Sequence, residues 1–368
     1  MTIKAFRILV MMTAVAAMLA LISVAGRYNP ATIKKAGVLM FPALSDKVNE
    51  VTKIHVRSQG GVLTVMREAK GWVLDDKNGY PVRDDRVRTA VIGLSELALS
   101  EPKTKLSERY ASLHVEDVDT DKSKSVELIL RNKDDDDLAN VIIGRRKFSY
   151  TDLAEGGLYV RKPGDAQSWL AIGEFGARTD PLYWLQTRIL EVPSDDVARM
   201  VTVQPDGTRL VISKASPDTP FFTVEDLPDG AKLRSPDAPD QLGMAMDGLD
   251  LVDVAPVSRI NFSGDSLAQA QAKTFDGLVI DMDLALLDGK TWTRFVASTE
   301  AQAAAEVLRK AEDINARLSN WAYQLKDYQI RNLRMKLKAL LKPEGDEGDG
   351  DDYEDEFMGL ENFGNSPQ

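Results

Sequence analysis

The residue types that carry out acid–base, nucleophilic or metal chemistry are sparse in this sequence. There are two histidines, His55 and His114, and no cysteine. The histidines lie far apart without the spacing of a metal site or a catalytic triad, so no zinc centre is expected. Each is predicted to be a packing or surface residue. The lack of cysteine excludes disulfides and lipid attachment through an N-terminal cysteine.

One short match to a nucleophile motif, S-x-x-K, occurs at Ser100–Lys103. Pro102 breaks the helix that would place the serine and the lysine on one face, and no K-T-G or S-D-N motif accompanies it. We interpret this match as coincidental. The sequence also lacks the G-x-S-x-G, P-loop and G-x-G-x-x-G motifs. No catalytic, cofactor-binding or metal-binding residue is therefore predicted, and no cofactor.

Carboxylates are too abundant to single out a pair suited to glycoside hydrolysis. The four consecutive aspartates, Asp134 to Asp137, are a candidate for binding a divalent cation. The alternative, which we favour, is a solvated hairpin tip.

The five tryptophans are spread along the chain, which favours core anchors over a sugar-stacking platform. They lie at positions 72, 169, 184, 292 and 321. Exposure of Trp169 or Trp292 would instead support a polysaccharide-binding surface.

Negative charge is concentrated at the C-terminus. Residues 343–368 hold ten acidic residues and no lysine or arginine, so they account for −10 of the net charge of −11. The remaining body is nearly neutral, which argues against nucleic-acid binding. The tail is too poor in apolar residues to pack and is predicted to be disordered. Four apolar residues interrupt it, and they either dock a partner or lie in a merely solubilising tail: Phe357, Met358, Leu360 and Phe363.

The N-terminus contains an uncharged apolar run from Ile8 to Ala25. As a helix it spans roughly 27 Å, close to the hydrocarbon core of a bilayer. We predict that residues 1–26 form an uncleaved signal anchor, a single transmembrane helix. The alternative is a signal peptide cleaved after Ala25, because Ser23–Ala25 fits the cleavage rule. Either interpretation exports the rest of the chain.

After a membrane-proximal connector at 27–47, alternating apolar residues predict antiparallel strands in two related α+β units, residues 48–192 and 193–342. Each unit begins with a hairpin, an aromatic strand and a helix, which we interpret as an internal repeat with an offset of about 147 residues. The matched pairs are Ile54 and Val56 with Val201 and Val203, Gly60 with Gly207, Leu63 and Val65 with Leu210 and Ile212, Trp72 with Phe222, Val82 with Leu233, and Leu97 with Leu249.

Helices are predicted from caps and from helical spacing of apolar residues. The first runs from Asp84 or Asp85 to Leu99, and Pro181 begins a short helix over Leu182–Leu190. Thr299 and Gln302 form a capping box for a helix that ends near Leu318. A further amphipathic segment covers Tyr328–Leu341.

The chain resembles a family of membrane-anchored periplasmic auxiliary proteins of unknown function that accompany gliding-motility-type (Gld-type) ABC transporters. The resemblance covers Ile8 to Leu341 and excludes the acidic tail. Besides the anchor, it rests on scaffold positions: Val51, Ile54, Trp72, Tyr80-Pro81-Val82, Gly144, Leu158-Tyr159-Val160-Arg161, Trp184-Leu185, Ile189-Leu190 and Trp321-Ala322-Tyr323.

The resemblance implies a periplasmic α+β protein tethered to the inner membrane beside an ABC permease, its ATPase and a Gld-type companion membrane protein. It implies no active-site residue. We therefore expect a non-enzymatic accessory protein of an ABC-type transport system that acts through protein–protein contacts. The alternatives are a module that binds cell-envelope polysaccharide or peptidoglycan, and an envelope hydrolase that uses paired carboxylates.

Overall fold

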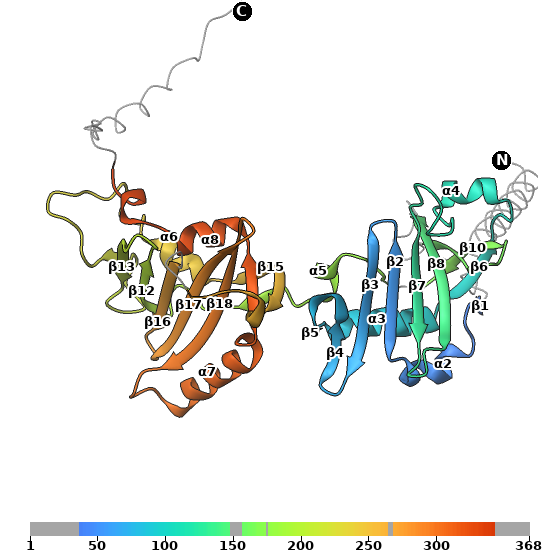
Figure 1. The fold of residues 1–368 in the computed structure, drawn as a ribbon, viewed down its shortest axis with the longest axis horizontal. Helices are drawn as coiled ribbons and strands as arrows, with labels where there is room; N and C mark the ends of the chain where they lie inside the picture. Colours follow the sequence, from blue (N-terminus) through green and yellow to red (C-terminus); the bar gives the residue numbers. More distant parts are fainter. Residues whose placement is uncertain (1–36, 148–156, 174–175, 264–267, 343–368) are drawn as a thin grey trace, which may run out of the picture. The chain divides into compact units, whose positions relative to one another are not determined.

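The computed structural model describes residues 37–147, 157–173, 176–263 and 268–342. Within these residues no helix is both long enough and apolar enough to cross a membrane. The predicted anchor, residues 1–26, and the acidic tail, residues 343–368, lie outside the described residues. The chain forms two compact units, Met1–Gln186 and Thr187–Gln368. The described parts are mostly antiparallel sheet with few helices, an α+β fold rich in strands (Figure 1).

The first unit is built on a ten-stranded sheet in which every neighbouring pair is antiparallel. In spatial order the strands are β1 (Val38–Leu39), β6 (Ala98–Pro102), β10 (Ser168–Ile172), β9 (Gly157–Arg161), β8 (Asp137–Lys147), β7 (Val126–Arg131), β2 (Lys53–Ser58), β3 (Gly61–Glu68), β4 (Gly71–Leu74) and β5 (Tyr80–Pro81). Its helices are α2 (Leu44–Lys47), α3 (Asp84–Ser95), α4 (Tyr110–Leu113) and α5 (Pro181–Trp184), with short 3₁₀ turns at 48–50, 75–77 and 107–109.

The core of the first unit lies between one face of this sheet and α3, which crosses the strands in Figure 1. Ile54 and Val56 alternate with less buried residues on β2, as the strand period of two requires. Val87, Val91 and Leu94 recur at helical spacing on α3 and are buried. β1 and α2 also belong to this unit, because β1 pairs with β6 and Leu44 is buried.

The second unit is built on a nine-stranded antiparallel sheet. In spatial order its strands are β11 (Arg188–Leu190), β15 (Leu249–Pro256), β19 (Trp321–Leu325), β18 (Lys290–Thr299), β17 (Leu278–Leu287), β16 (Ala268–Thr274), β12 (Val197–Val203), β13 (Arg209–Ser213) and β14 (Thr223–Val224). Its helices are α6 (Asp240–Gly243), α7 (Ala305–Leu318) and α8 (Asp327–Leu333), with 3₁₀ turns at 244–246, 257–259 and 337–339.

The two sheets have the same strand order. Each strand of the second unit has a counterpart in the first, and β5 is an addition at one edge of the first sheet. The pairs are β1 with β11, β6 with β15, β10 with β19, β9 with β18, β8 with β17, β7 with β16, β2 with β12, β3 with β13 and β4 with β14. In both units a helix, α3 or α6, follows the first group of strands.

In both units, the segment after the first group of strands pairs with the C-terminal end of the unit. Val82 forms an isolated antiparallel bridge to Leu185, and Leu233 forms one to Leu341. The backbone N–H of Arg83 donates to the carbonyl of Trp184 at 2.8 Å, and that of Arg234 donates to the carbonyl of Leu340 at 2.9 Å. Val82 and Leu233, which the sequence comparison pairs, thus occupy equivalent places in the two units.

The repeat is displaced by one residue on one strand. Val56 pairs with Leu63 and Ile54 with Val65, whereas Thr202 pairs with Leu210 and Met200 with Ile212. The buried counterparts of Ile54 and Val56 are therefore Met200 and Thr202, not Val201 and Val203. The turn of the second hairpin is one residue longer, and this shifts the preceding strand relative to a fixed offset.

Four predicted helices differ in their bounds. The helix predicted to end at Leu99 ends at Ser95, because Ala98–Pro102 forms β6 and pairs with β1 and β10, and its N-cap is Arg83 rather than Asp84 or Asp85. The segment at Leu182–Leu190 forms only the single turn α5 before β11, although Asp180 caps it by accepting from the Leu182 N–H at 3.0 Å. Strand β18 continues to Thr299, which pairs with Leu278, so α7 starts at Ala305 without the predicted capping box. The segment Tyr328–Leu341 is helical only as far as Leu333, followed by a 3₁₀ turn.

Candidate functional site

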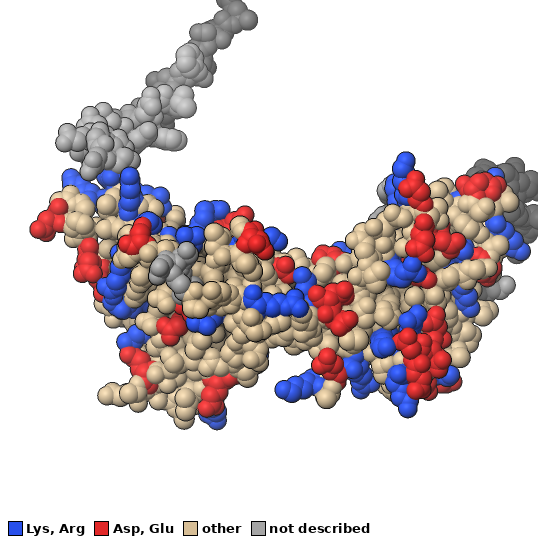
Figure 2. All heavy atoms as spheres, viewed as in Figure 1, with Lys and Arg blue, Asp and Glu red and all other residues tan. Residues whose placement is uncertain are grey.

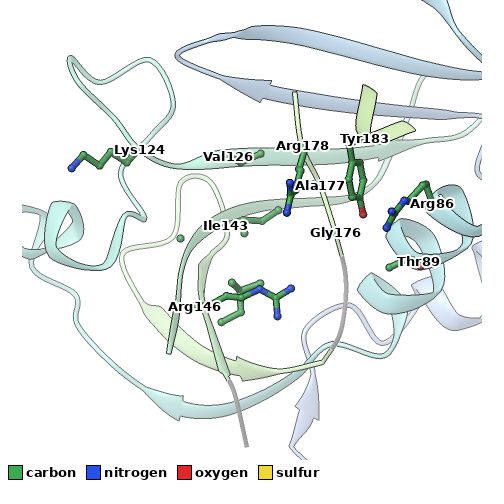
Figure 3. A pocket seen from close by; sticks show the side chains of 12 residues that line it. Arg86, Thr89, Lys124, Val126, Ile143, Arg146, Gly176, Ala177, Arg178 and Tyr183 are labelled. Carbon is green, nitrogen blue, oxygen red and sulfur yellow. The ribbon is translucent and has the colours of Figure 1, made fainter. Parts of the chain in front are cut away.

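A cationic cavity of about 370 Å³ lies at one end of the core of the first unit (Figure 3). We use the name "cationic cavity" for the space between α3, the ends of β7, β8 and β9, and the segment before α5. Its lining residues are Arg86, Thr89, Lys124, Val126, Ile143, Gly144, Arg146, Leu158, Gly176, Ala177, Arg178 and Tyr183.

The floor of the cavity is apolar and comes from three neighbouring strands. Val126 on β7 pairs with Ile143 on β8, and Leu158 on β9 lies beside them. These side chains extend the sheet face that α3 covers. They would place the apolar part of a ligand against the existing core.

A β-bulge puts an arginine over this floor. The register of β8 on β9 shifts between Ile143, which pairs with Val160, and Arg146, which pairs with Leu158. The extra residue brings Arg146 to the same face as Ile143, as bulges generally re-aim side chains. Arg145 then lies on the opposite face, with its guanidinium 5.6 Å from the ring centroid of Tyr159. Gly144 is required here, because a Cβ would collide with the Leu113 carbonyl oxygen.

The wall opposite Arg146 is a stack of two arginines on a tyrosine. The guanidinium of Arg86 lies 4.4 Å from the ring centroid of Tyr183, and that of Arg178 lies 5.3 Å from it. Arg86 and Thr89 come from adjacent turns of α3, three residues apart, so they face the same side. Trp184 fixes the segment that carries Arg178, because its buried indole N–H donates to the Arg178 carbonyl at 2.8 Å.

Among the residues that the structure describes, the lining of the cavity contains cationic side chains and no carboxylate. Arg86, Arg146 and Arg178 extend toward a common space in Figure 3, whereas Lys124 extends away from it at the rim. The nearby Asp85 is held by Arg83, with Nη2 2.6 Å from the carboxylate, and this hydrogen bond keeps the pKa of Asp85 below its ordinary value. The lining can bind an anion, and its described residues include no carboxylate or imidazole that could act as a base.

A family model matches residues 72–271 of the 368, and it is described as a domain of unknown function, DUF4340. The chain belongs to the DUF4340 family. The matched segment contains every residue that lines the cationic cavity and continues into the second unit as far as β16. No curated protein and no solved structure matches this DUF4340 chain.

The two histidines of this DUF4340 protein lie in different settings. His55 is on β2, with Nδ1 3.1 Å from the Thr64 hydroxyl, and Nε2 is buried without a hydrogen-bond partner among the described residues. Burial is the main cause that lowers its pKa. His114 ends α4 in the left-handed conformation, with φ of 58°. Within the described ranges no group of three His, Asp or Glu side chains is placed to hold a metal.

The four aspartates form the tip of the β7–β8 hairpin, where Figure 2 shows acidic and basic side chains together. Asp135 lies 2.8 Å from Lys53 Nζ and 3.3 Å from an Arg131 nitrogen, and Asp137 lies 2.7 Å from Arg131. Asp136 accepts from Asn132. These carboxylates face cationic and amide donors rather than a shared point.

The other residues singled out from the sequence are the S-x-x-K match, the tryptophans and the apolar residues of the tail. Ser100 lies in β6 and Lys103 follows the end of that strand, so no helix joins them, and Lys103 pairs with Glu101 at 2.5 Å. Trp184 and Trp292 are buried, and Trp72, Trp169 and Trp321 are half-buried. The proposed docking residues of the tail lie outside the described residues: Phe357, Met358, Leu360 and Phe363.

Sequence reasoning missed the cationic cavity. Its arginines lie on a helix, a bulged strand and a loop, separated by dozens of residues, so no local motif joins them. The family resemblance includes Gly144, which lines the cavity, but it gives no indication of the arginines around it.

Proposed function

We propose that this DUF4340 protein is a non-enzymatic accessory protein of an ABC-type transport system, anchored in the inner membrane by residues 1–26 with its body in the periplasm. Its partners are the permease, the ATPase and a Gld-type companion membrane protein. The transport association is supported by the family resemblance of the scaffold positions. We further propose that the two units arose by duplication, which their shared strand order supports.

The observation that carries the binding role is the lining of the cationic cavity. It combines three arginines, a lysine and a tyrosine over an apolar floor. Such a set binds and orients a charged group, whereas proton transfer needs a group that titrates near the working pH. The site therefore supports recognition of a partner or ligand better than it supports a reaction.

The test of the transport association is crosslinking in intact membranes with tagged full-length protein, followed by identification of the captured proteins. We expect an ABC permease and its ATPase among them. Capture of glycan-bound material, with no transporter subunit, would contradict the proposal and favour the polysaccharide-binding alternative.

One feature supports the polysaccharide-binding alternative. Half-buried Trp72 lines a second cavity of about 310 Å³ together with Arg67 and Arg88. An aromatic ring beside polar groups is a common sugar-binding arrangement. The two tryptophans that the sequence nominated do not provide such a surface, because Trp292 is buried and Trp169 is half-buried.

The hydrolase alternative requires a carboxylic acid and a carboxylate in contrasting environments. Asp281 and Asp283 line a cavity on the second sheet, about 340 Å³ in volume. Gln271 donates to Asp281 at 2.7 Å and Gln269 donates to Asp283 at 2.9 Å, while Arg294 also contacts Asp283 at 2.6 Å. Each carboxylate thus accepts a hydrogen bond from a glutamine amide, so the two do not lie in contrasting environments and give the hydrolase alternative little support.

A further inference from the structure

We propose that the second cavity of the first unit, which Trp72 lines, is a binding site for a pyranose sugar. We call it the Trp72 cavity: the space of about 310 Å³ between α3, the strands β3 and β4, and the 3₁₀ turn at 48–50. This inference goes beyond the transport association and does not depend on it. A failure to capture transporter subunits would leave the sugar site standing, and a failure to bind sugars would leave the transport association standing.

Three residues of the Trp72 cavity have counterparts in the second unit, and the hydrogen bonds of the backbone identify them. The N–H of Arg67 donates to the Thr52 carbonyl at 2.8 Å, and the N–H of Lys214 donates to the Ala198 carbonyl at 2.9 Å. The strand that follows each of these cations, β4 or β14, pairs with its neighbour in the same register. The counterparts are Asn49 and Asp195, Arg67 and Lys214, and Trp72 and Phe222.

In the second unit these three positions are closed. The Phe222 ring is buried, and the Lys214 ammonium lies 4.7 Å from the ring centroid and 3.5 Å from an Asp195 oxygen. Helix α6 packs directly on the ring, because a Cβ on Gly243 would collide with it. The fold can therefore bury an aromatic residue and its neighbouring cation at this place.

In the first unit the same positions are open. Trp72 is half-buried, Arg67 and Asn49 are exposed, and all three line the cavity. Among the described residues, the side chains of Asn49, Arg67 and Arg88 have no hydrogen-bond or ion-pair partner. The exposure of Trp72 is thus a property of this unit and not a requirement of the fold.

An indole ring beside unengaged amide and guanidinium groups fits a pyranose. One face of a pyranose ring presents C–H groups that pack on an aromatic face, and its edge carries hydroxyls in fixed directions. Asn49, Arg67 and Arg88 supply N–H donors for these hydroxyls. The Asp84 carboxylate and the Asn49 amide oxygen supply acceptors.

The size and floor of the cavity agree with a sugar ring. A volume of about 310 Å³ is at the small end of the range of ligand sites. Val87 and Val91 of α3 are buried and form an apolar floor. A single sugar unit, free or belonging to a longer chain, therefore matches the cavity.

A ligand-observed NMR titration of the full chain tests the proposal, in lauryldimethylamine oxide because this detergent has no sugar headgroup. The probes are maltotriose and triacetylchitotriose. The comparators are sorbitol, which has hydroxyls but no pyranose ring, and N-acetylleucine amide, which mimics an apolar side chain of a protein partner. We expect at least one oligosaccharide to bind about tenfold tighter than either comparator, because it combines stacking with hydrogen bonds. Saturation transfer should be strongest at the C–H protons of a sugar ring.

Two tryptophans of the first unit provide a matched pair of variants. Trp72→Ala should weaken oligosaccharide binding about tenfold, and Trp72→Phe, which keeps an aromatic ring, should weaken it less. Trp169→Ala is the control, because Trp169 is also half-buried but lies on β10 and does not line the cavity. It should bind within about twofold of the unchanged protein.

The arginines keep the proposal testable even if Trp72→Ala does not fold. Arg67 and Arg88 are exposed, so their replacement should leave the fold intact. Arg67→Gln and Arg88→Gln should each weaken oligosaccharide binding about fivefold through loss of a hydrogen bond. Arg109→Gln removes an exposed arginine that does not line the cavity, and it should change binding less than about twofold. Thermal unfolding of each variant verifies that it is folded.

Three results would overturn the inference. The first is no binding of either oligosaccharide by the unchanged protein. The second is a comparator that binds as tightly as the oligosaccharides, and for N-acetylleucine amide this would indicate docking of a protein side chain instead. The third is an equal loss of binding in the cavity variants and in their controls, Trp169→Ala and Arg109→Gln.

Discussion

Ile143 and Arg146 lie three positions apart on β8 and line the same cavity, because the register of β8 on β9 shifts between them. In a regular strand, residues three apart face opposite sides of the sheet. The bulge therefore converts an apolar sheet end into a cavity with a cation over its floor.

Replacing Gly144 with alanine should destabilise the first unit. The added Cβ would collide with the carbonyl oxygens of Leu113 and His114, and backbone cannot move aside cheaply. We expect a loss of about 1–3 kcal/mol in the free energy of unfolding, measured by urea denaturation. Gly60→Ala is the control, because its Cβ meets only the Ser58 hydroxyl, and it should cost less than about 0.5 kcal/mol. Equal costs at both positions would contradict this interpretation.

Replacing Arg161 with methionine should be among the most damaging changes in the first unit. Its buried guanidinium donates to the Val115 carbonyl at 2.9 Å, to the Asp165 carbonyl at 3.1 Å and to Asp117 at 2.5 Å. Methionine keeps much of the volume but leaves these acceptors unpaired, which should cost about 2–4 kcal/mol.

The contrasting variant is Asp117→Asn. The Asp117 side chain is 65% exposed, so water can take the place of its carboxylate as an acceptor for Arg161. We expect Asp117→Asn to lower the free energy of unfolding by less than about 1 kcal/mol. Urea denaturation of both variants measures the difference. If Asp117→Asn were as destabilising as Arg161→Met, the ion pair rather than the buried carbonyl contacts would be the main contribution.

His55 should make the stability of the first unit depend on pH. Burial, and then the charge of Arg131, lowers the pKa of His55 below its ordinary value of 6.5. The unfolded chain therefore binds more protons in this range, so stability rises with pH. The contribution is present above about pH 6.5 and is lost as the pH falls through the folded pKa. His55→Gln should flatten the dependence of the unfolding free energy between about pH 5 and 7.5, and parallel curves would contradict this.

The strands were largely predictable from sequence, and the long-range arrangement was not. Alternation of apolar residues predicts the strands that form β2 and β3, because Ile54, Val56, Leu63 and Val65 pack on the core with a period of two. The prediction of a capping box at Thr299 and Gln302 is wrong, because Thr299 pairs with Leu278 and so belongs to β18. The cationic cavity could not be predicted, because it depends on a bulge and on a loop–helix contact that leave no local pattern.

The acidic tail provides a prediction about partners. If Phe357, Met358, Leu360 and Phe363 dock a partner, replacing all four with serine should reduce capture of that partner in membrane crosslinking to the level seen after deletion of residues 343–368. The substitution leaves every acidic residue in place, so it separates apolar docking from charge. Capture that is unchanged by the deletion would leave only the solubilising role for the tail.

The central claim is the proposed transport association, and crosslinking of tagged full-length protein in intact membranes tests it most directly. The account predicts that an ABC permease and its ATPase are among the captured proteins. Capture of glycan-bound material without any transporter subunit would contradict the account.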